Sequence, residues 1–197
     1  MTDATPAIDP QHSALLVMDY QPAVLGYLTE VEPLLTRMAD AIAITREAGA
    51  SVAYVRVAFD DDDYAAIPTA NKAFAPLASG GVLHHEDPSS AVHHHVAPEQ
   101  GDIIVRKTRV GAFSTTDLDE QLRDRDITTL ILAGIATSGV VLSTVRDAAD
   151  RDYQVYVLAD GSADPDADVH DVLTQKVFPR QAHVINVGDL SGLLVAR

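Results

Sequence analysis

The 197-residue chain contains no cysteine and no tryptophan, and only 5% of its residues are aromatic. Without cysteine there can be no disulfide, no thiolate metal ligand and no thiol nucleophile. Positive charge is also scarce, because 14 Lys and Arg face 29 Asp and Glu and leave a formal net charge of −15. This balance repels phosphate backbones and acidic lipids, so we expect neither nucleic acids nor membranes as partners.

Long apolar runs are missing as well. No run approaches the roughly 18 residues that a membrane-spanning helix needs. The first residues, MTDATPAIDPQHSALLVMDY, lack the basic start and apolar stretch of a signal peptide, so we expect a cytoplasmic protein. Hydrophobic residues make up 47% of the chain, which suffices for a core, and the length predicts a single domain over residues 1–197.

Short runs rich in Val and Ile alternate with stretches of helical period. Strands are expected at 14–18, 51–57, 103–105, 129–133, 155–158 and 183–187, and helices at 32–48, 116–125, 138–151 and 167–177. The alternation predicts a three-layer, Rossmann-like α/β fold with about six mostly parallel strands and helices on both faces. Residues 59–101 are too long for an ordinary connection, so we expect a functional loop or an arm that packs on a partner.

Ligands of such folds bind at the carboxyl ends of the strands. Asp19 follows the first expected strand and Lys107 the third. Because side chains alternate along a strand, Lys107 and its neighbour Arg106 cannot both enter one pocket. A possible backbone cradle for an anion or oxyanion follows the fourth strand and comprises Gly134, Ile135, Ala136, Thr137, Ser138 and Gly139. Further candidates for the pocket lining are Gln21, Arg109 and Phe113.

Three segments, LLVMDYQ, RKTRVGAFSTTDLDEQLR and LILAGIATSGVVLSTVRDAADRDYQVYVLADG, resemble the signature segments of isochorismatase-like hydrolases. That superfamily includes isochorismatases and nicotinamidases, and the resemblance runs from about Ser13 to Ile185. It implies an isochorismatase-like fold, a homo-oligomer and a small-molecule substrate. It also implies catalytic roles for Asp19 and Lys107 and a cis peptide bond from Ile135 to Ala136. The family's usual cysteine nucleophile falls on Val140.

The missing thiol leaves three hypotheses open. Asp19 could act as a general acid on a vinyl ether, as in true isochorismatases, with Lys107 holding a substrate carboxylate or tuning the acid. A hydroxyl, from Ser138 or Ser143, could replace the thiol, although Ser138 is better placed to cap a helix. Alternatively, the chain is a catalytically inactive family member that binds a ligand or serves in assembly. We favour the first, with vinyl-ether hydrolysis ahead of amide hydrolysis.

Metal and cofactor signals are weak, and we expect neither. Metal-binding relatives use an Asp and a His after the second strand, where this chain has Arg56-Val57-Ala58-Phe59. Three consecutive histidines, His93 to His95, would diverge on an extended chain. The acidic run Asp164 to Asp168 lacks the later Gly and Glu of a calcium loop, so its last acid is expected to cap a helix. Asp60 to Asp63 is expected to form a solvated turn.

Overall fold

The structure, a computed structural model, describes residues 5–195. At its centre lies a six-stranded parallel sheet with the order β3-β2-β1-β4-β5-β6. The strands are β1 (Ser13–Met18), β2 (Ser51–Val57), β3 (Ile103–Lys107), β4 (Thr129–Gly134), β5 (Gln154–Leu158) and β6 (His183–Ile185). The predicted sheet is confirmed, and every strand pair is parallel. The strand order reverses between β1 and β4, which places a crevice for ligands at their carboxyl ends.

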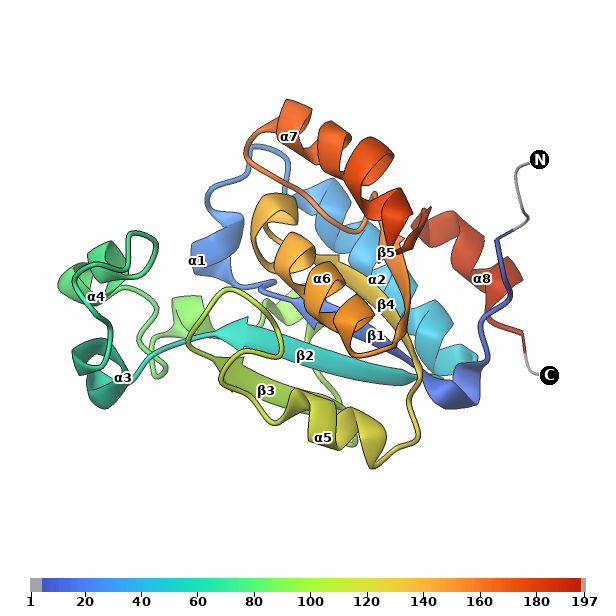
Figure 1. Ribbon diagram of the computed structural model, residues 1–197, viewed down its shortest axis with the longest axis horizontal. Helices are drawn as coiled ribbons and strands as arrows, with labels where there is room; N and C mark the ends of the chain where they lie inside the picture. Colours follow the sequence, from blue (N-terminus) through green and yellow to red (C-terminus); the bar gives the residue numbers. More distant parts are fainter. Residues whose placement is uncertain (1–4, 196–197) are drawn as a thin grey trace.

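Helices cover both faces of the sheet (Figure 1). One face packs on α2 (Glu32–Glu47) and α8 (Leu190–Leu193), and the other on α5 (Leu118–Arg123), α6 (Leu142–Asp150) and α7 (Ala167–Val172). Alternation along β1 explains this division, because Leu15 faces the α2 side and Leu16 faces the α6 side. The predicted three-layer α/β class is therefore confirmed. Within residues 5–195, none of the helices has the length and apolar character that crossing a membrane requires.

Several predicted boundaries are shifted by local hydrogen bonding. The helix predicted at 138–151 begins as a π turn, Thr137–Val141, and continues as α6; likewise α7 continues into a π turn, Leu173–Val177. The last strand stops at Ile185 instead of residue 187, because Asn186 and Asp189 form a capping box around a 3₁₀ turn, Val187–Asp189. The remaining short helices are α1 (Pro22–Leu25) and the 3₁₀ turns Pro10–His12 and Phe178–Arg180.

Residues 59–101, left without predicted elements, fold into short helices. They are α3 (Asp61–Ala65), α4 (Ala75–Gly80) and the 3₁₀ turns η2 (Pro88–Ser90) and η3 (His94–Val96). Residues 60–83, here called the arm, project from the sheet at the left of Figure 1. The arm has a small apolar cluster of its own, formed by Phe59, Ile67, Phe74 and Leu83 together with Val57.

The expectation of a solvated turn at Asp60 to Asp63 is wrong. The Asp60 side chain accepts the backbone N–H of Asp63, and the Asp63 side chain accepts that of Asp60, which together form a capping box at the start of α3. Both carboxylates also bind the Arg106 guanidinium. The helix cap and the Arg106 counter-ion therefore offset the repulsion between the neighbouring carboxylates. The ion pairs with Arg106 also link the arm to β3.

Candidate active site

Strand β1 delivers Asp19 to the carboxyl edge of the sheet. The residue has a φ of 59°, a left-handed conformation that Asp adopts more readily than most residues. Its backbone N–H donates to the Val55 carbonyl oxygen at 2.8 Å, and its own carbonyl oxygen accepts the Gln21 N–H at 2.8 Å. These two bonds fix the turn after β1. Asp19 is only 5% exposed, so its carboxyl is held away from bulk water.

Lys107, at the end of β3, reaches the same place from two strands away. Its ammonium donates to Asp19 Oδ2 at 2.8 Å, to the Val110 carbonyl oxygen at 2.9 Å and to the Arg109 carbonyl oxygen at 3.2 Å. An ammonium group has three N–H donors, so all three are occupied. Arg106 points to the other side and binds the arm, which confirms the prediction from alternation.

The second carboxyl oxygen of Asp19, Oδ1, differs from Oδ2 in its hydrogen bonding. Within the described part of the chain, Oδ1 is the buried side-chain oxygen or nitrogen that lacks a hydrogen-bond partner. Burial raises the pKa of the Asp19 carboxyl above its ordinary value, although the Lys107 ammonium opposes this shift. A buried carboxyl with one fixed and one free oxygen is suited to giving or accepting a proton.

The turn after β4 brings a third element to the site. Its Ile135–Ala136 peptide bond is cis, as predicted. Gly134 is required by close packing, since a Cβ there would lie 3.0 Å from the Met18 carbonyl oxygen and 3.1 Å from Val140 Cγ1. The Thr137 N–H donates to the Ala163 carbonyl oxygen at 2.8 Å, so it is not free for a ligand.

Ser138 does not cap the following helix, contrary to the prediction. It lies inside the π turn and is exposed, and its N–H donates to the Asp164 carboxylate at 2.8 Å. The Gly139 N–H donates to the Ala136 carbonyl oxygen at 3.0 Å. Much of the expected cradle is thus occupied by bonds within the protein. The acid that caps α7 is Asp166, not Asp168 as predicted, because Asp166 accepts the N–H groups of the first turn.

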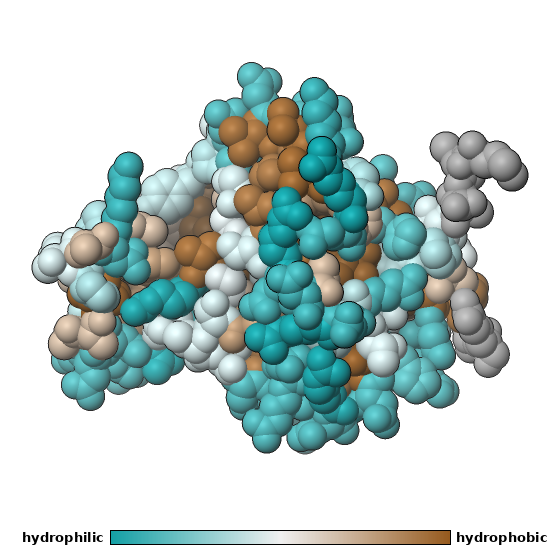
Figure 2. All heavy atoms as spheres, in the orientation of Figure 1, coloured by the Kyte–Doolittle hydropathy of each residue, from teal (hydrophilic) through white to brown (hydrophobic). Residues whose placement is uncertain are grey.

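A cavity of about 220 Å³ opens beside the Asp19–Lys107 pair. On the sheet side its lining is Asp19, Val57, Lys107, Val110, Ile135, Ala136, Gly139 and Val140. On the other side it comprises α1 and its continuation, Ala23, Val24 and Tyr27, and the arm, Phe74, Leu77, Val82 and Leu83. Figure 2 shows hydrophobic atoms, in brown, in the recess between the arm and the body of the molecule. Val140, to which the sequence resemblance assigns the family's nucleophile position, is 2% exposed and presents methyl groups.

Three predicted lining residues lie elsewhere. Gln21 is fully buried and bridges segments, donating to the carbonyl oxygens of Val57 and Ser90 and accepting the Val57 N–H. Phe113 stacks on Tyr153 in the core on the α6 side. Arg109 lies with its guanidinium 5.8 Å from the centre of the Phe74 ring and does not line the cavity. The arm residues that line it were not predicted, because residues 59–101 show no regular period.

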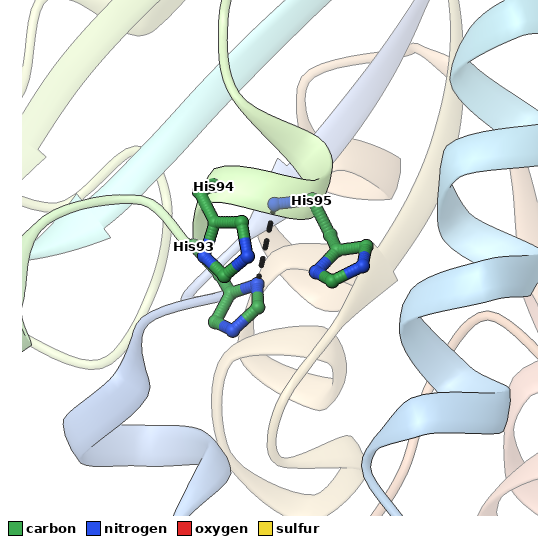
Figure 3. Close-up of side chains that lie close together, drawn as sticks. All are labelled: His93, His94 and His95. Carbon is green, nitrogen blue, oxygen red and sulfur yellow. Dashed lines mark hydrogen bonds between the residues drawn. The ribbon is translucent and has the colours of Figure 1, made fainter.

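The histidines differ from expectation in geometry. His93 to His95 lie on a 3₁₀ turn instead of an extended chain, so their rings gather, with one ligand atom from each within 4.8 Å of the others (Figure 3). The expectation that the rings diverge is therefore wrong. His93 Nδ1 accepts the backbone N–H of His95, and none of the three lines the cavity. The metal position of the nicotinamidases does not fit here, since Val57, Ala58 and Phe59 offer no ligand atoms.

The sequence and the fold agree on the class of protein. The isochorismatase domain matches residues 13–189, and the chain belongs to this family of hydrolases. It is 34% identical over 177 residues to the ureidoacrylate amidohydrolase RutB of Methylobacterium radiotolerans, covering 79% of this chain and 69% of that protein. It is 32% identical over 175 residues to the isochorismatase family protein YwoC of Bacillus subtilis, covering 88% and 89%.

Solved structures give the same result. An isochorismatase family protein from Burkholderia thailandensis superimposes with a TM-score of 0.82 at 27% identity, covering 97% of this chain and 99% of that chain. A cysteine hydrolase from Pseudomonas syringae superimposes with a TM-score of 0.86 at 24% identity, covering 98% of each, which shows the shared fold. The family resemblance predicted from the sequence is confirmed.

Proposed function

We propose that this chain hydrolyses a small molecule by acid–base chemistry at Asp19, without a covalent intermediate. The observation that carries the proposal is the Asp19 carboxyl itself. The residue lines a cavity, its Oδ2 is held by Lys107, and its Oδ1 is buried without a hydrogen-bond partner. A buried polar atom without a hydrogen bond is unfavourable, so its persistence in a side chain that lines a cavity favours a role with a ligand.

Hydrolysis of a vinyl ether uses this arrangement most directly. Protonated Asp19 gives its Oδ1 proton to the terminal carbon of the C=C bond, whose electron pair forms the new C–H bond. The resulting oxocarbenium ion adds one water molecule, and the Asp19 carboxylate takes the proton that this water loses. The hemiketal then separates into a carbonyl compound and an alcohol. One water is consumed, and Asp19 ends protonated as it began.

Lys107 serves as a positioning residue in this scheme. Its three donors are committed to Asp19 Oδ2 and two backbone carbonyl oxygens, which supports the tuning role over the holding of a substrate carboxylate. By occupying Oδ2 with a donor, the ammonium leaves Oδ1 as the oxygen that carries the mobile proton. Burial raises the pKa of the Asp19 carboxyl, which favours its acid form.

Amide hydrolysis, which the name of the RutB relative describes for that protein, is less well supported here. A thiol nucleophile is excluded because the chain contains no cysteine and Val140 stands at the position. A hydroxyl substitute is poorly placed, since neither Ser138 nor Ser143 lines the cavity. Water would have to attack the amide directly, and an amide lacks the carbon that Asp19 can protonate to form an oxocarbenium ion.

Turnover in deuterated water tests the proposal. Alkyl vinyl ethers and size-matched amides are incubated with the parent and with Asp19→Asn, and products are followed by NMR. We expect the parent to cleave a vinyl ether and to place one deuterium on the new methyl group, and Asp19→Asn to be slower by about 10²–10⁴-fold. Equal rates for the two proteins would contradict the role of Asp19. No turnover of any compound by the parent would instead favour the alternative of a ligand-binding or assembly protein.

A further inference from the structure

While Asp19 is ionised, the charge of the Asp19–Lys107 pair is balanced before any ligand enters the cavity. Asp19 and Lys107 form an ion pair in which both side chains are almost fully buried, at 6% and 2% exposure. All three N–H donors of Lys107 have acceptors within the protein, so none is free to meet a substrate anion. A carboxylate entering this space would lose its hydration without gaining a charged donor in return.

No other cation compensates. Among the residues that the structure describes, Lys107 is the single positively charged side chain in the cavity lining. Arg106 binds the two carboxylates of the arm on the other side of β3, and Arg56 donates to the Ser90 carbonyl oxygen. Arg109 lies over the Phe74 ring and donates to the Thr108 carbonyl oxygen. Tyr27 adds a hydroxyl, but it is 69% exposed and belongs to the rim.

The rest of the lining is apolar. Apolar side chains line the cavity on both sides: Val24 on α1, Phe74, Leu77 and Leu83 on the arm, and Ile135 and Val140 after β4. The cavity, at about 220 Å³, is smaller than the pockets of roughly 300–1,000 Å³ that hold drug-sized ligands. Asp19 contributes a carboxyl group to this lining. These features favour a small apolar body with one polar group.

We infer that this cavity selects small uncharged, largely apolar molecules and discriminates against carboxylates, and that the arm supplies the selectivity. The inference depends on the proposed function only in taking this cavity as the substrate site. It sets this chain apart from a site that recognises an anionic substrate, which would present a free guanidinium or ammonium group.

Binding of matched probes tests the inference separately from turnover. Cyclohexanecarboxamide, cyclohexanecarboxylate and cyclohexylmethylammonium share one apolar body and differ in charge. Each is titrated into the parent protein at pH 7.5, and NMR reports binding and any cleavage in the same tube. We expect the amide to bind at least about tenfold more tightly than either ion. A carboxylate that binds as tightly as the amide, or an amide that does not bind, would overturn the inference.

A charge placed on the arm sharpens the test. Leu77 is half-buried on α4 and lines the cavity, whereas Ser79 is exposed on the same helix and does not. Leu77→Arg should tighten carboxylate binding by about fivefold or more, because it brings a free donor to the lining. Leu77→Gln and Ser79→Arg are the controls for side-chain size and for net charge, and neither should change the preference. Equal effects of Leu77→Arg and Ser79→Arg would show that the arm does not set selectivity.

The two proposals can fail independently. Binding selectivity without turnover would contradict acid–base catalysis at Asp19 and leave the selectivity intact. Efficient cleavage of a carboxylate-bearing vinyl ether, at a rate equal to that of its uncharged counterpart, would contradict the selectivity and leave catalysis by Asp19 intact.

Discussion

The two walls of the cavity differ in how they are built. The sheet wall consists of residues at the carboxyl ends of β1, β2, β3 and β4 and in the turns that follow them, and these strands pair in one parallel sheet. The arm wall consists of Phe74, Leu77, Val82 and Leu83, which lie on α4 and in the turns at its two ends. The ionisable groups, Asp19 and Lys107, belong to the sheet wall, which also carries apolar side chains, whereas the arm wall is apolar throughout. The two proposals therefore assign reactivity and selectivity to separate parts of the fold.

The largest effect should come from removing the cation of the sheet wall. Lys107→Met leaves the Asp19 carboxyl buried without its counter-ion and two carbonyl oxygens without a donor. We expect the free energy of unfolding, measured with urea at pH 7, to fall by about 3–5 kcal/mol. Arg106→Met is the matched control from the same strand. Its partly exposed ion pairs should contribute only about 0–1 kcal/mol.

The pH dependence of this loss follows from Asp19. Burial raises its pKa in the folded state, so the folded protein is penalised when the carboxyl is ionised. The resulting stability is present below the unfolded pKa and is lost as pH rises through the folded pKa. Without Lys107 the penalty should grow, and the deficit of Lys107→Met should shrink as pH falls toward about 4. If Lys107→Met lowered the free energy of unfolding equally at pH 7 and at about pH 4, the ion-pair explanation would be contradicted.

The pH profile of turnover gives the next effect. If Asp19 acts as an acid, kcat/KM should decline as pH rises through its raised pKa, by about tenfold for each further pH unit. Initial rates with an uncharged vinyl ether between pH 4 and pH 9 measure this limb. A rate that increases with pH over the same range would indicate that the carboxylate acts as a base instead.

Changes in the arm wall should divide the kinetic constants differently. Phe74 packs edge-on against Phe59, with 5.9 Å between ring centres, and its loss enlarges the cavity. We expect Phe74→Ala to raise KM for an uncharged substrate by about tenfold while kcat changes by less than about threefold. Ser79→Ala, at an exposed position of the helix α4 that follows Phe74, is the control. A large fall in kcat at constant KM would show that the arm takes part in the chemistry.

A smaller effect is expected on the alkylation rate of a thiol introduced between the two walls. Val140→Cys introduces a thiol into the cavity, and Ser79→Cys introduces one on the surface. For each variant we compare the rate of alkylation by iodoacetamide with that by the anionic iodoacetate. This rate ratio should be several-fold higher for Val140→Cys than for Ser79→Cys, since the cavity holds no free cation. Alkylation followed by mass spectrometry measures both rates. Identical reagent ratios at the two positions would contradict an uncharged cavity.

The smallest effect is expected at the histidine cluster. None of its residues lines the cavity, and the carboxyl that does is already bound to an ammonium group. We therefore expect His94→Ala to leave turnover unchanged, and chelators to have no effect on either protein. Loss of activity on chelation that is reversed by added zinc would contradict the predicted absence of a metal.

The sheet wall could be predicted because its signals are local and regular. Buried parallel strands read as short apolar runs, and the residue after each run must lie at the carboxyl edge. Asp19 and Lys107 follow from that rule and from alternation along β3. The arm wall could not be predicted from the sequence, because its helices are too short to show a helical period of apolar residues. The one local signal was the spacing of Asp60 and Asp63, which fits a capping box as well as a solvated turn.

Other errors have the same origin in competing hydrogen bonds. Gln21 is near Asp19 in sequence, yet the backbone of Val57 and Ser90 takes its whole side chain. Ser138 has a residue type suited to capping, yet the π turn displaces it by placing Ala136 at the start. In both cases the decisive partner lies far along the chain, where a sequence pattern gives no indication of it.

Val140 also has a consequence for detection. Reagents that profile hydrolases of this family through a reactive sulfur need a thiolate to form a covalent adduct. This chain offers none, so peroxide and alkylating agents cannot silence it by that route, and sulfur-directed surveys of a proteome will pass over it. Searches for related activities that begin from thiol labelling will therefore undercount proteins that carry a hydrocarbon side chain at this position.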